Sequence, residues 1–249
     1  MEDTPQRVFL LIADISGYTK YMTSKRRTLA HAQAIITELM EAIITEIRIP
    51  LHIIEVEGDA VFFYGVEEPG VYTWEQVVSL TSNKIFDFFQ AYYHRLNHLR
   101  KSNMCHCSAC DGISHLKLKI IAHIGEALFY KIDKFSKLGG PDVILLHRLL
   151  KNSIEADEYL LMTDQSFSEI NQYKTFDVER RSEDYDELGR IGLYAHYPGI
   201  SGPIPEKSQD DSSKVSLYQR IKQTMKIGLR GMVIIQGLKK QRSYRNLPG

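Results

Sequence analysis

The sequence predicts an α+β fold of the split βαβ type, in which a strand, a helix, a hairpin, a second helix and a further strand follow one another. Apolar runs of strand length occur at 8–14, 51–57 and 116–124. Two long segments between these runs repeat apolar residues at helical spacing. Gly58 and Asp59 separate two strand-like runs, as the turn of a tight hairpin does.

The first strand and the first helix have the most regular patterns. Residues 8–14 are a run of apolar side chains that ends at Asp14, which is typical of a buried strand. Residues 26–48 repeat apolar side chains at intervals of three or four, and Pro50 ends the pattern. The repeating set comprises Leu29, Ala32, Ile36, Leu39, Ile43 and Ile47. We therefore expect an amphipathic helix that packs on the sheet.

The later elements complete the predicted order. They are a hairpin at 51–57 and 60–64, a helix at 74–100, strands at 116–124 and 126–131, a helix at 142–153, and strands at 159–163 and 190–197. This order is that of a ferredoxin-like split βαβ sandwich, whose first two strands run parallel and end at the same edge of the sheet. Asp14 and Asp59 should then lie side by side.

A pair of carboxylates at one sheet edge suits a hard cation. A buried carboxylate is costly unless a positive group compensates it. Carboxylate oxygens are the ligands that Mg²⁺ and Mn²⁺ prefer. Asp14 and Asp59 therefore predict a site for these ions, of the kind that organises phosphate chemistry. Taken singly, each aspartate is more often a turn residue or a helix cap.

The composition divides the chain into an acidic domain and a basic tail. The chain of 249 residues has no net charge, but no acid follows Asp211, so nine bases give the tail a charge of +9. We expect a domain over 1–200, a linker over 201–214 and a basic amphipathic segment over 215–249. No apolar run reaches membrane-spanning length and no signal-peptide pattern is present, so we expect a cytoplasmic protein.

The basic tail has two alternative interpretations. Its apolar stretch from Met225 to Leu238 lies among bases, so it could bind a membrane surface peripherally or dock on a protein partner. Alternatively, it is a helix that packs on its own acidic domain. Binding to nucleic acid is not expected.

Three cysteines gather in one short segment. Cys105, Cys107 and Cys110 follow the spacing Cys-x-Cys-x-x-Cys, which in an intracellular chain favours a soft-metal site, most often for Zn²⁺. Three thiolates need a fourth ligand, and the candidates are His94, His98 and His106. The alternative is three ordinary thiols in a loop.

Four motifs resemble those of one enzyme family in the same order along the chain. They are Ala13-Asp14-Ile15-Ser16-Gly17-Tyr18-Thr19, Glu57-Gly58-Asp59-Ala60, His123-Ile124-Gly125-Glu126, and Gly140-Pro141-Asp142-Val143 followed by His147-Arg148. Together they resemble the class III nucleotidyl cyclases over about residues 8–197. The resemblance implies the fold of that family, in a divergent branch.

The resemblance also implies a reaction. The family converts a nucleoside triphosphate, here GTP or ATP, into a 3′,5′-cyclic nucleotide and pyrophosphate by two-metal catalysis. By this resemblance Asp14, Ile15 and Asp59 hold two Mg²⁺ or Mn²⁺ ions, and the site forms at a homodimer interface. Arg148 of the second chain approaches the α-phosphate. The implied nucleotide-binding positions are Gly17, Tyr18, Thr19, Glu55, Lys137 and Arg190.

Several of these positions depart from the family pattern. The asparagine that contacts ribose falls on Ile144, and the phosphate-binding lysine falls on Leu188, although Arg190 is close by. Glu55 stands where guanylate cyclases also carry Glu, because a carboxylate accepts hydrogen bonds from guanine. Lys137 either donates to guanine O6 or pairs with Glu55. Three functions remain: a cyclase that favours GTP, an inactive module that binds nucleotide or metal, and a membrane-surface scaffold that acts through the basic tail.

Overall fold

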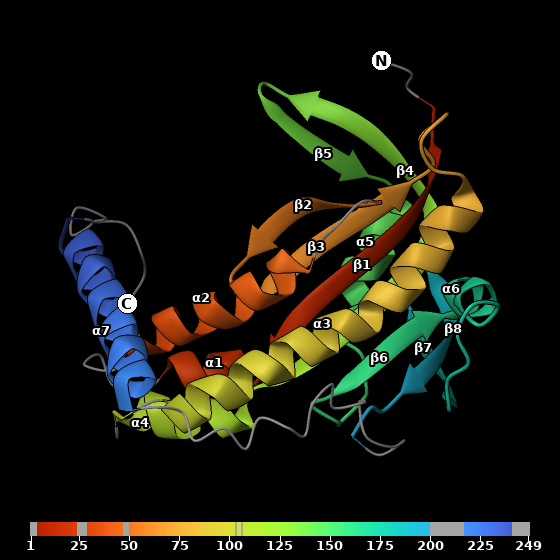
Figure 1. Ribbon diagram of the computed structural model, residues 1–249. Helices are drawn as coiled ribbons and strands as arrows, with labels where there is room; N and C mark the ends of the chain where they lie inside the picture. The colour runs from red at the N-terminus through yellow and green to blue at the C-terminus, as the bar shows by residue number, and fades with distance from the viewer. Residues whose placement is uncertain are drawn as a thin grey trace.

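The computed structural model describes residues 4–23, 29–46, 50–102, 104–105, 107–199 and 217–240. Within these residues the strands are β1 (Gln6–Ser16), β2 (Leu51–Glu57), β3 (Ala60–Val66), β4 (Lys117–Ile132), β5 (Phe135–Gly139), β6 (Tyr159–Thr163), β7 (Glu179–Tyr185) and β8 (Gly189–His196). The helices are α1 (Tyr18–Met22), α2 (Leu29–Thr45), α3 (Trp74–Ser102), α4 (Ser108–Asp111), α5 (Pro141–Leu149), α6 (Asp164–Ile170) and α7 (Leu217–Lys240), with a 3-10 turn η1 (Gly112–His115). Figure 1 shows their arrangement.

One mixed sheet forms the centre of the molecule. Its order is β2-β3-β1-β4-β6-β8-β7, and β5 pairs with the outer part of β4. β1 is antiparallel to both β3 and β4, whereas β4 and β6 are parallel. β2 is antiparallel to β3, so β1 and β2 run in the same direction with β3 between them.

β1 separates two apolar cores. Because successive side chains of a strand point to opposite faces, Phe9 and Leu11 pack with α2 and α3, whereas Leu10 and Ile12 pack on the other face with α5. All four are fully buried. This explains why the strand reads as a continuous apolar run. Asp14 follows Leu10 and Ile12 in the same alternation, so it belongs to the α5 face.

The predicted break between two strands at Gly125 is wrong, because β4 runs unbroken from Lys117 to Ile132. Gly125 permits close packing and does not form a turn: a Cβ atom there would lie 2.3 Å from Cγ of Asp142.

Beyond the sheet, β4 pairs with β5 as a projecting hairpin (Figure 1). β5, β7, α4, α6 and the turn η1 were not predicted. β7 reads Glu-Arg-Arg-Ser-Glu-Asp-Tyr, a charged pattern that suits the edge of a sheet.

The predicted basic tail contains α7, which packs on the domain that precedes it. Its inner face buries Ile227 and Gln223 against α2 and α3. This is the second of the two alternatives. The outer face exposes Tyr218, Met225, Leu229 and Met232, and its binding to a membrane or partner stays a prediction. The linker at 201–214 lies outside the described residues. No helix in the described ranges has the length and apolar character to cross a bilayer.

Charge complementarity positions α7. Glu38 of α2 is only 2% exposed. Its carboxylate lies 2.7 Å from Lys226 Nζ and 2.7 Å from Arg230 Nη1, both on α7. It also accepts a hydrogen bond from Arg95 of α3. The one acidic side chain thus joins three elements.

Replacing Glu38 with glutamine should loosen α7, because three cations would then crowd together without a buried counter-charge. We expect a loss of about 2 kcal/mol in the free energy of unfolding, which lowers Tm by about 4–8 °C in a chain of this size. Thermal unfolding measures the change. The control is Glu41→Gln, because Glu41 pairs with the same Arg230 but is half-exposed, and its loss should cost under about 1 kcal/mol. Equal effects of the two variants would contradict this account.

Candidate metal and nucleotide site

Asp14 and Asp59 lie together at the edge of the sheet, as the sequence predicts. Asp14 is opposite Ala60 in the β1–β3 register, and Asp59 occupies the turn between β2 and β3. The Ile15 backbone N–H donates to the Asp59 carbonyl oxygen at 3.2 Å. Burial raises the pKa of Asp59 above its usual range, and the charge and hydrogen bond of Asp14 raise it further. Such crowding of two carboxylates is what a bound cation would relieve.

Lys119 is part of this site, although the sequence analysis did not single it out. It lies opposite Asp14 in the β1–β4 register, and its Nζ is 2.8 Å from the Asp14 carboxylate. The signal in the sequence was weak, because a lysine in the alternation of β4 also suits solvent. When both carboxylates are ionised, the one ammonium leaves the cluster with a net charge of −1, which favours a bound cation.

The predicted phosphate turn follows β1 directly. Gly17 adopts φ 85°, a left-handed conformation that favours glycine, and α1 begins at Tyr18. Burial raises the pKa of Tyr18, and the charge of Asp59 raises it further. Thr19 is exposed in α1. Ile15 has a fully buried side chain, so only its backbone can reach a ligand.

Glu55 and Lys137 form an ion pair, with Lys137 Nζ 2.8 Å from the Glu55 carboxylate. The pair joins β2 to β5, and both side chains are partly exposed. Of the two predicted roles for Lys137, pairing with Glu55 is the one present here. The Lys137 ammonium is a hydrogen-bond donor and the Glu55 carboxylate is an acceptor. Because they lie next to each other, they can bind one ligand together.

Arg148 and Arg190 lie with the β7–β8 hairpin instead of the carboxylates. Arg148 Nη2 is 3.3 Å from Glu187, and Arg190 donates to Ser182 at 3.1 Å. Arg190 also lines an open cavity of about 520 Å³ with Arg180 and Asp164. The two arginines have different neighbours, and among the described side chains neither pairs with Asp14 or Asp59.

The sheet register shows how far Arg190 is from the carboxylates. Asp14 is opposite Lys119, Lys119 is opposite Tyr159, and the next residue of β6 is opposite His196. Arg190 lies six positions from His196 along β8. At about 3.3 Å per residue, this places Arg190 about 20 Å along the sheet from the row of Asp14.

His123 is a packed strand residue. It is buried, and its two ring nitrogens lie 2.9 Å from Thr163 Oγ1 and 3.0 Å from Asp142 Oδ1. Asp142 also accepts from the Glu126 backbone N–H at 2.7 Å. These bonds tie the start of α5 to β4, and they hold Asp142 against Gly125.

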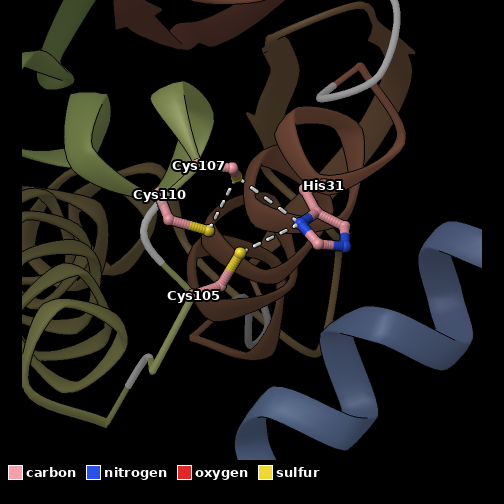
Figure 2. A group of neighbouring side chains, drawn as sticks. All are labelled: His31, Cys105, Cys107 and Cys110. Carbon is pink, nitrogen blue, oxygen red and sulfur yellow. Dashed lines mark hydrogen bonds between the residues drawn. The ribbon is translucent and has the colours of Figure 1, made fainter.

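The cysteines meet a histidine that the sequence analysis did not name. His31 Nδ1 lies 3.7 Å from Cys105 Sγ and 3.6 Å from Cys107 Sγ, and the sulfur atoms of Cys107 and Cys110 are 3.4 Å apart (Figure 2). Of the predicted fourth ligands, His94 and His98 are not part of this cluster. His98 Nδ1 lies 3.3 Å from Arg95 Nη1 and 3.4 Å from Ser102 Oγ, His94 is exposed, and His106 lies outside the described residues. Burial acts to raise the pKa of Cys107, but hydrogen bonds from its neighbours outweigh burial and lower it to about 7.

Comparisons of sequence find relatives without a described activity. A family described as "Protein of unknown function (DUF2652)" matches residues 36–159. The uncharacterized protein Rv2561/Rv2562 of Mycobacterium tuberculosis is 34% identical over 127 residues. This alignment covers 51% of the present chain and 56% of the relative, so the chain matches little more than half the length of that protein.

Comparisons of structure find nucleotidyl cyclase domains. The adenylyl cyclase CyaB of P. aeruginosa aligns with a TM-score of 0.55 and 14% identity, over 79% of this chain and 96% of its own. The guanylyl cyclase Cya2 aligns with a TM-score of 0.57 and 12% identity, over 79% and 94%. A bacterial light-regulated adenylyl cyclase aligns with a TM-score of 0.54 and 13% identity, over 91% and 58%. The chain therefore has a cyclase-like fold.

Proposed function

We propose that the protein is a nucleotidyl cyclase that forms a 3′,5′-cyclic nucleotide and pyrophosphate from a nucleoside triphosphate. The observation that carries the proposal is the pairing of Asp14 with Asp59 at one sheet edge, directly before the Gly17 turn. The strand order β4-β1-β3-β2 fits the ferredoxin-like core that the proposal requires. The cyclase-like fold of the structural neighbours supports it.

The carboxylate site fits Mg²⁺ or Mn²⁺. Asp14 and Asp59 offer hard oxygen ligands, and their mutual repulsion disfavours the doubly ionised state unless a cation is present. When bound, divalent ions supply Lewis-acid activation of the ribose 3′-hydroxyl and neutralise charge on pyrophosphate. Lys119 holds Asp14 in place and leaves Asp59 free of an ion pair among the described side chains.

The other proposed contacts come from polar groups on the chain. Backbone N–H groups of the turn from Gly17 to Thr19 receive the triphosphate oxygens. Glu55 accepts from the guanine N1–H and amino group, and Lys137 donates to O6, which makes GTP the favoured substrate over ATP. Arg148 contacts the α-phosphate, where a guanidinium stabilises the charge of the transition state.

We propose a homodimer, because Arg148 pairs with Glu187 in its own chain and not with a carboxylate of the candidate metal site. In a two-fold dimer, Arg148 and the β7–β8 hairpin of one protomer complete the carboxylate site of its partner. The β4–β5 hairpin supports this assembly with exposed apolar side chains beyond the sheet. They are Leu128, Tyr130, Ile132 and Phe135, of which Phe135 is 57% exposed. Exposed apolar groups of this kind mark association surfaces.

Binding of Mn²⁺ tests the metal site without relying on turnover. Titration followed by electron paramagnetic resonance should show binding by the wild type and at least about tenfold weaker binding by Asp14→Asn and Asp59→Asn. Asp157→Asn is the matched control, because Asp157 is an exposed loop carboxylate. Equal affinity in all four proteins would reject the carboxylate pair as the metal site.

The second candidate function is a module that binds nucleotide or metal without turnover. Ile144 favours it: the side chain is 54% exposed on α5 and cannot hydrogen-bond to ribose, where the family pattern has asparagine. Leu188, in the β7–β8 turn, likewise lacks the charge of the family's lysine.

Ile144→Asn distinguishes the two functions. If the protein is a slow cyclase, the new amide can orient the ribose, and we expect turnover to rise by about tenfold, the size of one added hydrogen bond of about 1.4 kcal/mol. The exposed position makes the change compatible with folding. Steady-state product formation measures it, with Ile144→Ala as the control that removes the apolar group without adding a donor. An equal rise in both variants would contradict the ribose contact.

A further inference from the structure

We propose that His31, Cys105, Cys107 and Cys110 form a structural Zn²⁺ site that fastens the segment after α3 to the start of α2. The four ligand atoms all lie within 4.8 Å of one another. In Figure 2 the three sulfur atoms and the His31 ring converge on one point from two separate parts of the chain. The proposal concerns a site distinct from the carboxylates and does not rest on the proposed function.

Three of the distances between the ligand atoms are close to those of tetrahedral zinc. Bonds of about 2.3 Å to sulfur and about 2.0 Å to nitrogen place two sulfurs about 3.8 Å apart, and a sulfur and a nitrogen about 3.5 Å apart. The distances here are 3.4 Å between Cys107 and Cys110, 3.6 Å from Cys107 to His31, and 3.7 Å from Cys105 to His31. A set of three cysteines and one histidine with no water position is that of a closed, structural zinc site.

The burial of the cluster agrees with a structural role. Cys110 is buried, and the other three residues are half-buried. The metal would lie between α2, which carries His31, and the segment at α4, which carries the cysteines. Among the described residues, no contact joins this cluster to Asp14 or Asp59. Closed sites of this kind contribute to folding, because the unfolded chain does not hold the ligands together.

The segment that carries the cysteines supports the Gly17 turn. A Cβ atom on Gly112 would lie 3.4 Å from the ring of Tyr21 in α1, and one on Gly17 would lie 3.1 Å from the carbonyl oxygen of His115. Because α4 and η1 have only four residues each, the segment has little hydrogen bonding of its own to hold its shape. Zinc would make this support rigid.

The zinc site also lies against α7. A Cβ atom on Gly231 would lie 3.2 Å from Cδ2 of His31, so the imidazole is held between the thiols and the tail helix. Removing zinc frees the His31 ring, and the packing of α7 on α2 should weaken with it. Loss of the metal is therefore expected to lower Tm.

Metal analysis tests the proposal. The full-length protein, purified under reducing conditions without chelator, should contain one zinc per chain by elemental mass spectrometry. After exchange, Co²⁺ should give thiolate charge-transfer bands and tetrahedral d–d bands. Cys107→Ser and His31→Ala should lower zinc affinity by at least about 100-fold, whereas His94→Ala, on the exposed face of α3, should leave it unchanged.

A ligand-conserving variant guards against simple misfolding. Cys105→His keeps four ligands and should retain zinc, while its Co²⁺ spectrum should lose intensity in the thiolate bands. A wild-type protein with no zinc and no affinity for it would overturn the proposal. A Cys107–Cys110 disulfide that persists under reducing conditions would also overturn it, as would equal zinc affinity in His31→Ala and the wild type.

Discussion

Asp59→Asn is expected to reduce cyclic-nucleotide formation by at least about 1,000-fold. The carboxylate is one of two that would hold the divalent ions, and charge stabilisation by such ions is worth several kcal/mol in the transition state. A loss of about 4 kcal/mol corresponds to about three orders of magnitude in rate. Asparagine has the same shape, so the β2–β3 turn should be kept.

The folding of this variant separates a catalytic role from a structural one. Asp14 and burial both raise the pKa of Asp59, so the ionised carboxylate is held at a cost in the folded protein. Its neutral replacement should leave Tm equal or slightly higher near neutral pH. Asp157→Asn serves as the control for turnover. Wild-type turnover in Asp59→Asn would show that the metal assignment is wrong.

Two inactive chains should restore activity to each other. If the carboxylates of one protomer work with Arg148 of its partner, a heterodimer of Asp59→Asn with Arg148→Ala has one site built only from intact parts. Co-expression with two different tags and sequential purification isolates this heterodimer. We expect about half of the wild-type activity, since one of two symmetric sites is intact. Each parent homodimer should be nearly inactive.

The matched control places both substitutions on one chain, paired with a wild-type chain. Under the proposed geometry both of its sites are broken, and it should be inactive. If each site instead lies within one chain, the wild-type protomer keeps half of the activity and the first heterodimer has none. The two heterodimers contain the same substitutions, so differences in folding cannot explain opposite results.

The carboxylate pair could be predicted because strand ends and topology determine it. Asp14 and Asp59 each close an apolar run, and the direction of β1 and β2 follows from the order of elements. The prediction of the later strands failed at Gly125, because this glycine is required by a contact between distant parts of the chain and not by a local turn. Gly125 suggested a turn, but it makes room for Asp142 within a continuous strand.

Contacts between distant parts of the chain were the hardest to predict. His31 is 74 positions from Cys105, and no spacing rule links a helical histidine to that loop. Lys119 meets Asp14 only through the β1–β4 register. The position of α7 depends on the buried Glu38, and burial of one acid within an amphipathic helix is not visible in its sequence pattern. In each case the local sequence pattern does not identify the residue that the side chain contacts in the folded protein.

Product analysis shows whether the protein is a nucleotidyl cyclase. The purified protein is incubated with Mn²⁺ and each of ATP, GTP, CTP and UTP, with Asp59→Asn in parallel, and the products are identified by mass spectrometry. We expect a cyclic nucleotide, most abundant with GTP, that the variant does not form. No cyclic product from any of the four with folded, dimeric protein would contradict it and favour the binding module.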